Sequence, residues 1–138
     1  VRQFENLASR SSNLILQPDV MNLGGITQAL EVCRLAERHG LRVCPHDAQG
    51  PVSRACCIQL AALSPAVWML EDFDPWKAPW TREIATTYRA ERGSIRFKEM
   101  PPGLGVTVDW EQVREHPYDP NGWVPLFEAG WEQRRGSA

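Results

Sequence analysis

Short apolar runs alternate with longer amphipathic segments over the first half of the chain. The runs at 13–17, 41–44 and 66–70 have the length of buried strands. Between them, segments 26–39 and 51–63 carry apolar residues at helical spacing. Strands that alternate with helices pair in parallel through right-handed crossovers, so the pattern predicts an α/β fold of successive βα units.

Local signals predict where the two long helices begin and end. His39 and Gly40 form a stop, because Gly40 can adopt the left-handed conformation that ends many helices. Pro51 suits the first position of the second helix, and Ser64-Pro65 ends it. The predicted buried stripes, with Glu37 at the edge of the first, are Ile26, Ala29, Leu30, Cys33 and Ala36, and then Val52, Cys56, Leu60 and Leu63.

The pattern changes in the second half of the chain. Residues 72–82 are rich in Asp, Pro and Trp, which is typical of a long functional or capping loop. Residues 84–89 and 94–98 flank a turn and predict a small antiparallel hairpin. We expect a further strand at 106–108, then a brief helix at 110–115 capped by Asp109.

Beyond that helix the C-terminal tail is irregular but aromatic enough to pack on something. The change of pattern predicts two parts, a βα part at 1–83 and a part at 84–138 that holds the hairpin, a glycine-rich segment and the tail. The first residue is Val1, and the absence of an initiator methionine hints that the chain begins within a longer protein.

Composition narrows the class of protein. The chain has 138 residues, 43% of them hydrophobic, and a net charge of -2, which gives no basic surface for nucleic acid and no charge run for a membrane surface. The four cysteines form no C-x-x-C pair and lie in apolar segments: Cys33, Cys44, Cys56 and Cys57. We therefore expect buried free thiols and a cytoplasmic location.

An ionisable residue follows the C-terminal end of each of the three predicted strands: Asp19, His46 and Glu71. Side chains at the ends of adjacent parallel strands lie side by side, so an acid and an imidazole would meet here. A carboxylate beside one ring nitrogen of His46 fixes its tautomer and leaves the other nitrogen for proton transfer. The alternatives are a helix-capping Asp19, a structural His46 and a surface Glu71.

Several motifs follow one another in a fixed order: Gln17-Pro18-Asp19, Gly24-Gly25-Ile26-Thr27, Pro45-His46, Gly50-Pro51 and Pro102-Gly103-Leu104-Gly105-Val106. In order and spacing they resemble the mandelate racemase branch of the enolase superfamily, and within it the acid-sugar dehydratases. The resemblance covers roughly residues 14–109, with 27 residues from Asp19 to His46 and 25 from His46 to Glu71.

The resemblance implies a fold and a set of roles. The fold would be the last three βα units of a (β/α)8 barrel, so the chain is expected to be a C-terminal portion. Asp19 and His46 would form an acid/base dyad, Glu71 would hydrogen-bond the substrate carboxylate in a protonated state aided by a flanking anion, and Trp76 could contact substrate. In the family the metal is Mg²⁺, held on strands that this sequence lacks, so we expect no metal ligands here and no metal binding by this chain alone.

The implied reaction is removal of the proton α to a carboxylate of a sugar acid, followed by β-elimination of water. The complete enzyme would be a homo-oligomer that needs neither nucleic acid nor membrane. A racemase or cycloisomerase of the same superfamily, and a catalytically silent remnant that only associates with a partner, remain as alternatives. The isolated chain is expected to be inactive.

Overall fold

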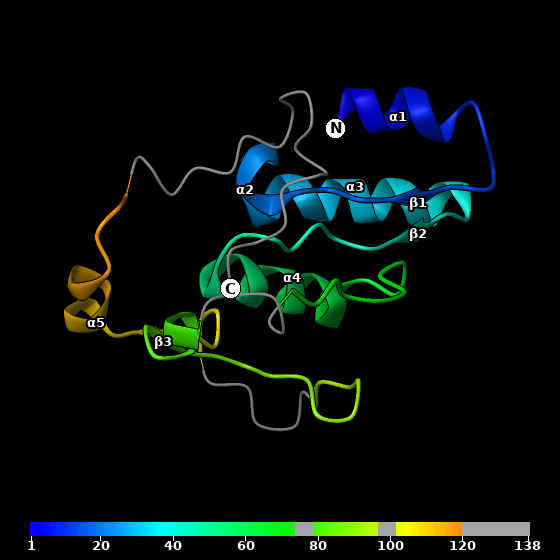
Figure 1. Cartoon of the computed structure of the whole chain (residues 1–138). Coiled ribbons are helices and arrows are strands. Elements are labelled where there is room, and N and C mark those ends of the chain that lie inside the picture. Colours follow the sequence, from blue (N-terminus) through cyan, green and yellow to red (C-terminus); the bar gives the residue numbers. More distant parts are fainter. Residues whose placement is uncertain (74–78, 97–101, 120–138) are drawn as a thin grey trace, which may run out of the picture.

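The computed structural model describes residues 1–73, 79–96 and 102–119 (Figure 1). Its elements in chain order are α1 Arg2–Ala8, β1 Ile15–Leu16, α2 Val20–Leu23, α3 Ile26–His39, β2 Arg42–Val43, α4 Pro51–Leu63, a 3₁₀ turn at Pro79–Arg82, β3 Ala85–Thr86, β4 Thr107–Val108 and α5 Trp110–Glu115. The helices in these ranges are too short or too polar to cross a membrane.

The predicted parallel strands are present in the predicted order. β1 pairs with β2 in parallel, with Ile15 opposite Arg42 and Leu16 opposite Val43. On the other side of β2, Val43 makes a parallel bridge to Val67. There the amide of Val43 donates to Ala66 at 2.8 Å, and the amide of Trp68 donates to Val43 at 2.9 Å. β2 is therefore the central strand, and the segment at 66–68 is the third.

Helix α3 packs against α4 and against β2 (Figure 1). Of the stripe predicted for α3, Ala29, Cys33 and Ala36 are buried, while Ile26 and Leu30 are only partly buried. The other buried side chains of α3 are Val32 and Leu35. The main apolar core joins α3 and α4 to the strands, with Leu16, Leu41 and Val43 from the sheet and Cys57 and Leu60 from α4.

The stripe predicted for α4 is partly wrong. Cys56 and Leu60 are buried, but Val52 is 39% exposed and Leu63 is 60% exposed. A continuous run from Ser53 to Ile58 is buried instead. The helix is enclosed on more than one face near its start, so a single 3.6-residue stripe does not describe it.

The C-terminal part differs from the predicted hairpin. A tight turn is present, with an antiparallel bridge between Glu91 and Ser94 and positive φ angles at Arg92 (52°) and Gly93 (76°). However, Ala85–Thr86 pairs with β4 and not with the segment after the turn, in the residues that the structure describes. The predicted strand at 106–108 thus supplies the partner. Residues 97 and 98, the end of the predicted hairpin, lie outside the described ranges.

Helix α5 begins where predicted. The carboxylate Oδ1 of Asp109 accepts the backbone N–H groups of Glu111 at 3.0 Å and Gln112 at 3.1 Å. These bonds satisfy donors that a helix start leaves without partners. The tail from residue 120 lies outside the described ranges.

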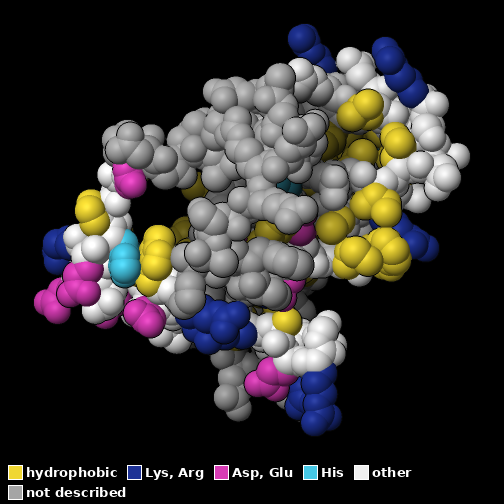
Figure 2. Space-filling model, viewed as in Figure 1, with side chains coloured by type: hydrophobic (Ala, Val, Ile, Leu, Met, Phe, Trp, Pro, Cys, Tyr) yellow, Lys and Arg dark blue, Asp and Glu magenta, His cyan; other side chains and the backbone are white. Residues whose placement is uncertain are grey.

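Large apolar side chains are exposed beside the small sheet. Ile15 is 48% exposed, Trp68 is 51% exposed and Met69 is 47% exposed. Figure 2 shows hydrophobic side chains gathered on one flank of the molecule. A hollow of about 530 Å³ runs along the third strand, with Val67 and Leu70 in its wall. Exposed apolar surface next to a strand marks a face that favours packing against another element.

The end of α3 offers a test of the fold. Gly40 has φ 63° and ψ 26°, and the amides of Gly40 and Leu41 donate to Glu37 and Ala36 in the last turn. Because a side chain at this left-handed position is strained, Gly40→Ala is expected to lower the free energy of unfolding by about 1 kcal/mol. Gly40→Asn, which tolerates the conformation better, should cost less. Urea unfolding followed by circular dichroism measures both, and equal losses would contradict the cap.

Candidate active site at the strand ends

Asp19 lies at the C-terminal end of β1, where it begins helix α2. Its Oδ1 accepts the backbone N–H groups of Met21 at 2.9 Å and Asn22 at 3.2 Å. The chain then turns at Gly24, with φ 98°, into α3. The helix-capping role considered for Asp19 is therefore real. It uses only one of the two carboxylate oxygens.

The other oxygen of Asp19 faces His46. Asp19 Oδ2 lies 3.0 Å from Nδ1 of His46. The backbone holds the pair together as well, because the two residues form a parallel bridge and the amide of His46 donates to Pro18 at 3.1 Å. The side chain of Asp19 is 15% exposed and that of His46 is 41% exposed. One imidazole edge is thus fixed by the carboxylate while part of the ring remains open to solvent.

Two side-chain amides complete the surroundings of Asp19 Oδ2. Nδ2 of Asn22 lies 2.7 Å away and Nε2 of Gln49 lies 2.6 Å away. Burial raises the pKa of Asp19, but the hydrogen bonds from His46, Gln49 and the α2 amides outweigh it and lower the pKa. At pH values above the ordinary pKa of an aspartate, the ionised carboxylate of Asp19 therefore stabilises the folded state. This contribution is lost as the pH falls through the lower folded-state pKa.

Glu71 reaches the same end of the sheet from the third strand. Its Oε2 accepts the backbone N–H of Asp47, the residue after His46, at 2.8 Å. Glu71 thus contacts the residue that follows His46, next to the Asp19–His46 pair. The flanking acids that are expected to favour a protonated Glu71 are Asp72 and Asp74. Asp72 forms an ion pair with Arg54 at 3.0 Å, so its charge is balanced by a guanidinium, and Asp74 lies outside the described residues.

Arg54 joins three segments around the site. It projects from α4 and is 3% exposed, and Asp47 is 1% exposed. Nη1 of Arg54 lies 3.5 Å from Asp47 and 3.0 Å from Asp72, while Nε donates to the carbonyl oxygen of Tyr88 at 3.3 Å. One buried cation therefore connects the loop after β2, the loop after the third strand and the C-terminal part.

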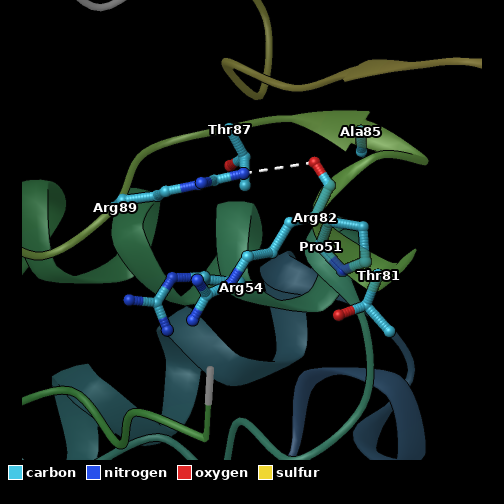
Figure 3. A pocket seen from close by; sticks show the side chains of 7 residues that line it. All are labelled: Pro51, Arg54, Thr81, Arg82, Ala85, Thr87 and Arg89. Atoms are coloured by element: carbon cyan, nitrogen blue, oxygen red, sulfur yellow. Dashed lines mark hydrogen bonds between the residues drawn. The ribbon is translucent and has the colours of Figure 1, made fainter. Parts of the chain in front are cut away.

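A small cavity lies beside Arg54 (Figure 3). Its volume is about 20 Å³, and Arg54, Arg82 and Arg89 contribute to its wall. Across it, the Nη2 group of Arg89 donates to the carbonyl oxygen of Arg82 at 3.1 Å. The space suits about one water molecule and is far below the volume of a pocket for a sugar acid. It is not a substrate site.

The four cysteines are free and buried, as the sequence predicts. Burial raises the pKa of Cys33 to about 11 and that of Cys57 to about 12. Cys57 lies under the site, with Sγ 3.8 Å from the carbonyl oxygen of His46. Thiols with pKa values this high stay protonated near neutral pH, so Cys33 and Cys57 are not nucleophiles.

The described residues do not fit a magnesium site. Within 1–73, 79–96 and 102–119 there is no group of three or more His, Cys, Asp or Glu residues that could hold a metal ion. The carboxylate oxygens of Asp19 are also occupied by hydrogen-bond donors. A hard cation such as Mg²⁺ needs several free oxygen ligands in one place.

The loop predicted at 72–82 contains two tryptophans. Trp76 lies outside the described residues. Trp80 stacks on His116 with ring centroids 4.3 Å apart and an angle of 14° between the planes. Trp80 therefore packs on a side chain of the C-terminal part.

Two residues of this site were missed by the sequence interpretation. Arg54 is a charged residue inside an apolar helical segment, which is a signal of a buried ion pair. Gln49 is an amide three residues after His46, and its sequence position alone gives no sign of its contact with Asp19.

The comparison with protein families decides the membership of this chain. Residues 1–113 match the family described as "Enolase C-terminal domain-like". The chain belongs to this family. Its three strands and their helices are part of an enolase-type barrel domain, and the superfamily that the motifs indicate is confirmed.

Similar proteins point to one branch of the superfamily. D-gluconate dehydratase of Thermoproteus tenax is 34% identical over 117 residues, which are 83% of this chain and 23% of that protein. D-galactonate dehydratase of Variovorax paradoxus is 29% identical over 127 residues, 88% of this chain and 33% of that protein. This chain thus spans 23% to 33% of the length of these two relatives.

Solved structures agree with the fold. A mandelate racemase/muconate lactonizing enzyme from Sulfitobacter sp. matches with a TM-score of 0.78 and 33% identity, over 88% of this chain and 30% of that one. An enolase from Pantoea ananatis with bound D-gluconate and Mg matches with a TM-score of 0.76. The two sequences are 20% identical, and the match covers 86% of this chain and 29% of the Pantoea chain. At this identity the match supports the fold alone.

The buried guanidinium provides the test of how the site is held together. Arg54→Met keeps most of the side-chain volume but takes the cation away from the buried Asp47 and from Asp72. We expect a loss of about 3 kcal/mol in the free energy of unfolding, because removing one partner leaves a buried charge uncompensated. Denaturant unfolding of the purified chain measures it.

The matched control is Arg34→Met on α3. Arg34 pairs with Glu31 on the surface, with side chains 55% and 42% exposed. This pair should contribute less than about 0.5 kcal/mol. Equal losses for the two variants would show that Arg54 does not hold the site together.

Proposed function

We propose that this chain is the C-terminal portion of a magnesium-dependent acid-sugar dehydratase and supplies the acid/base half of its active site. The observation that carries the proposal is the 3.0 Å contact between Asp19 Oδ2 and His46 Nδ1 at adjacent strand ends. The dehydratase relatives support the reaction class, and their named substrates, D-gluconate and D-galactonate, support a sugar acid as substrate.

The proposed chemistry follows from the atoms of the dyad. Asp19 holds Nδ1, so Nε2 of His46 is the atom that exchanges a proton with the substrate. In a dehydratase, the proton α to the carboxylate is removed and the β-hydroxyl leaves as water. His46 acts as the general acid or base on one face of the substrate, and such positioned proton transfer contributes about 10²–10⁴-fold. Glu71 would hydrogen-bond the substrate carboxylate.

In this proposal the metal belongs to the complete enzyme. Mg²⁺ would stabilise the negative charge that develops on the substrate carboxylate, and its ligands would lie on barrel strands outside this sequence. The exposed apolar residues beside the sheet and the hollow along the third strand support a face built to pack on further barrel strands. The chain alone is then inactive. The division into 1–83 and 84–138 belongs to the same proposal.

The complete enzyme would be a cytoplasmic homo-oligomer that uses neither nucleic acid nor membrane. Four buried free cysteines support a reducing compartment. Trp76 remains a proposed substrate contact. The dehydratase relatives favour this activity over a racemase or cycloisomerase.

A fusion tests the proposed function. The portion of the Thermoproteus tenax enzyme that precedes its matched region would be joined to residues 1–138. Magnesium-dependent release of the 2-keto-3-deoxy acid from D-gluconate is expected from the fusion and not from the chain alone. His46→Asn should then lower kcat by about 10²-fold or more, because the proton-transferring nitrogen is lost.

The control is His39→Asn, which changes the exposed last residue of α3. It should leave kcat unchanged, with circular dichroism showing that both fusions fold. Turnover by a folded His46→Asn fusion at the unmutated rate would refute the dyad. Turnover by the 138-residue chain alone would refute its role as half of a site.

A further inference from the structure

Gln49 contacts Asp19 from the loop that leads into α4. Its Nε2 lies 2.6 Å from Asp19 Oδ2, while its Oε1 accepts a hydrogen bond from Oγ of Ser53 at 3.1 Å. Ser53 is 2% exposed and projects from the first turn of α4. A chain of hydrogen bonds thus runs from α4 through Gln49 and Asp19 to His46.

The orientation of the Gln49 amide follows from the chemistry of its two neighbours. An ionised carboxylate only accepts hydrogen bonds, so the NH₂ group must face Asp19. The amide oxygen then faces Ser53, whose hydroxyl can donate to it. Ser53 is fixed on a helix, and this contact keeps the donor of Gln49 aimed at the carboxylate.

Five donors approach the Asp19 carboxylate, and Gln49 supplies one of the two side-chain amides that reach Oδ2. Oδ1 accepts two backbone N–H groups from α2, and Oδ2 has donors from Asn22, His46 and Gln49. Two carboxylate oxygens offer about four lone-pair sites. A proton on Asp19 would therefore have to displace one of these donors.

We propose that Gln49, held by Ser53, is a positioning residue that keeps the Asp19 carboxylate ionised and turned toward His46. Asp19 then remains an acceptor toward Nδ1 of His46, which leaves Nε2 as the proton-transferring atom of the proposed dyad. This role rests on the proposed function and extends it: Gln49 would prevent Asp19 from taking up the proton that His46 exchanges with the substrate.

The other ionisable groups around the dyad do not replace Gln49. Oε2 of Glu71 accepts the backbone N–H of Asp47. Oδ2 of Asp47 lies 3.5 Å from Nη1 of Arg54. Burial keeps the thiol of Cys57 neutral, with a pKa of about 12. None of these groups adds a donor to Asp19.

The test is the titration of the Asp19 carboxyl in the 138-residue chain, followed by ¹³C NMR. Gln49→Met preserves the length of the side chain but removes the donor, and Gln49 is exposed, so the core remains intact. The pKa of Asp19 is expected to rise by about 0.5 to 1 pH unit, as the loss of one hydrogen bond to the charged form requires. Gln49→Glu, which adds a negative charge, should raise it further.

Two variants separate the role of Gln49 from a general effect. Ser53→Ala should raise the pKa of Asp19 by less than Gln49→Met, because the amide remains but loses its fixed orientation. Gln59→Met makes the same change on α4, where Nε2 donates to Gly103 at 3.3 Å. It should leave the titration of Asp19 unchanged. An unchanged titration in Gln49→Met, or an equal shift in Gln59→Met, would overturn the proposal.

This measurement needs no turnover, so it is independent of the proposed function. In the fusion, Gln49→Met should move the acid limb of the kcat–pH profile toward higher pH with KM unchanged. If Asp19 titrates as expected but the profile does not move, the positioning by Gln49 stands and the catalytic role of the dyad fails.

Discussion

The carboxylate of Asp19 is the group on which the site depends, because it satisfies two demands at once. One oxygen caps α2 and so fixes the turn from β1 into α3. The other oxygen lies 3.0 Å from His46 at the end of the neighbouring strand. A single ionised side chain therefore sets both the local backbone and the orientation of the imidazole. The bonds that lower its pKa are the same bonds that build the loop around it.

A second polar centre holds the remaining loops. The guanidinium of Arg54 contacts Asp47, Asp72 and the carbonyl of Tyr88 while it is almost fully buried. Buried charges of this kind are maintained only when they are paired, so the three segments must come together for any of them to be stable. Asp19 and Arg54 thus organise the C-terminal ends of adjacent parallel strands, the face where barrel enzymes place their catalytic residues.

Much of this arrangement could be predicted from the sequence because the deciding signals are local. Gly40 and Pro51 mark helix ends, and the periodicity of the strands and helices leads to Asp19, His46 and Glu71. The remainder depends on contacts between distant segments. Ala85–Thr86 pairs with β4 because the fold brings Thr107 and Val108 beside it. The side-chain amide of Gln49 donates a hydrogen bond to Asp19, 30 residues earlier in the sequence. No pattern in the sequence predicts this contact.

The most direct test of the account is the tautomer of His46, read from ring ¹H–¹⁵N correlations in the 138-residue chain at a pH where the ring is neutral. The hydrogen bond to Asp19 predicts a proton on Nδ1 and a free Nε2. In Asp19→Asn the side-chain oxygen should still accept the backbone N–H groups of α2, so the NH₂ group faces Nδ1 of His46. Nδ1 must then accept a hydrogen bond, and the ring proton should move to Nε2. A wild-type ring protonated on Nε2 would contradict the account.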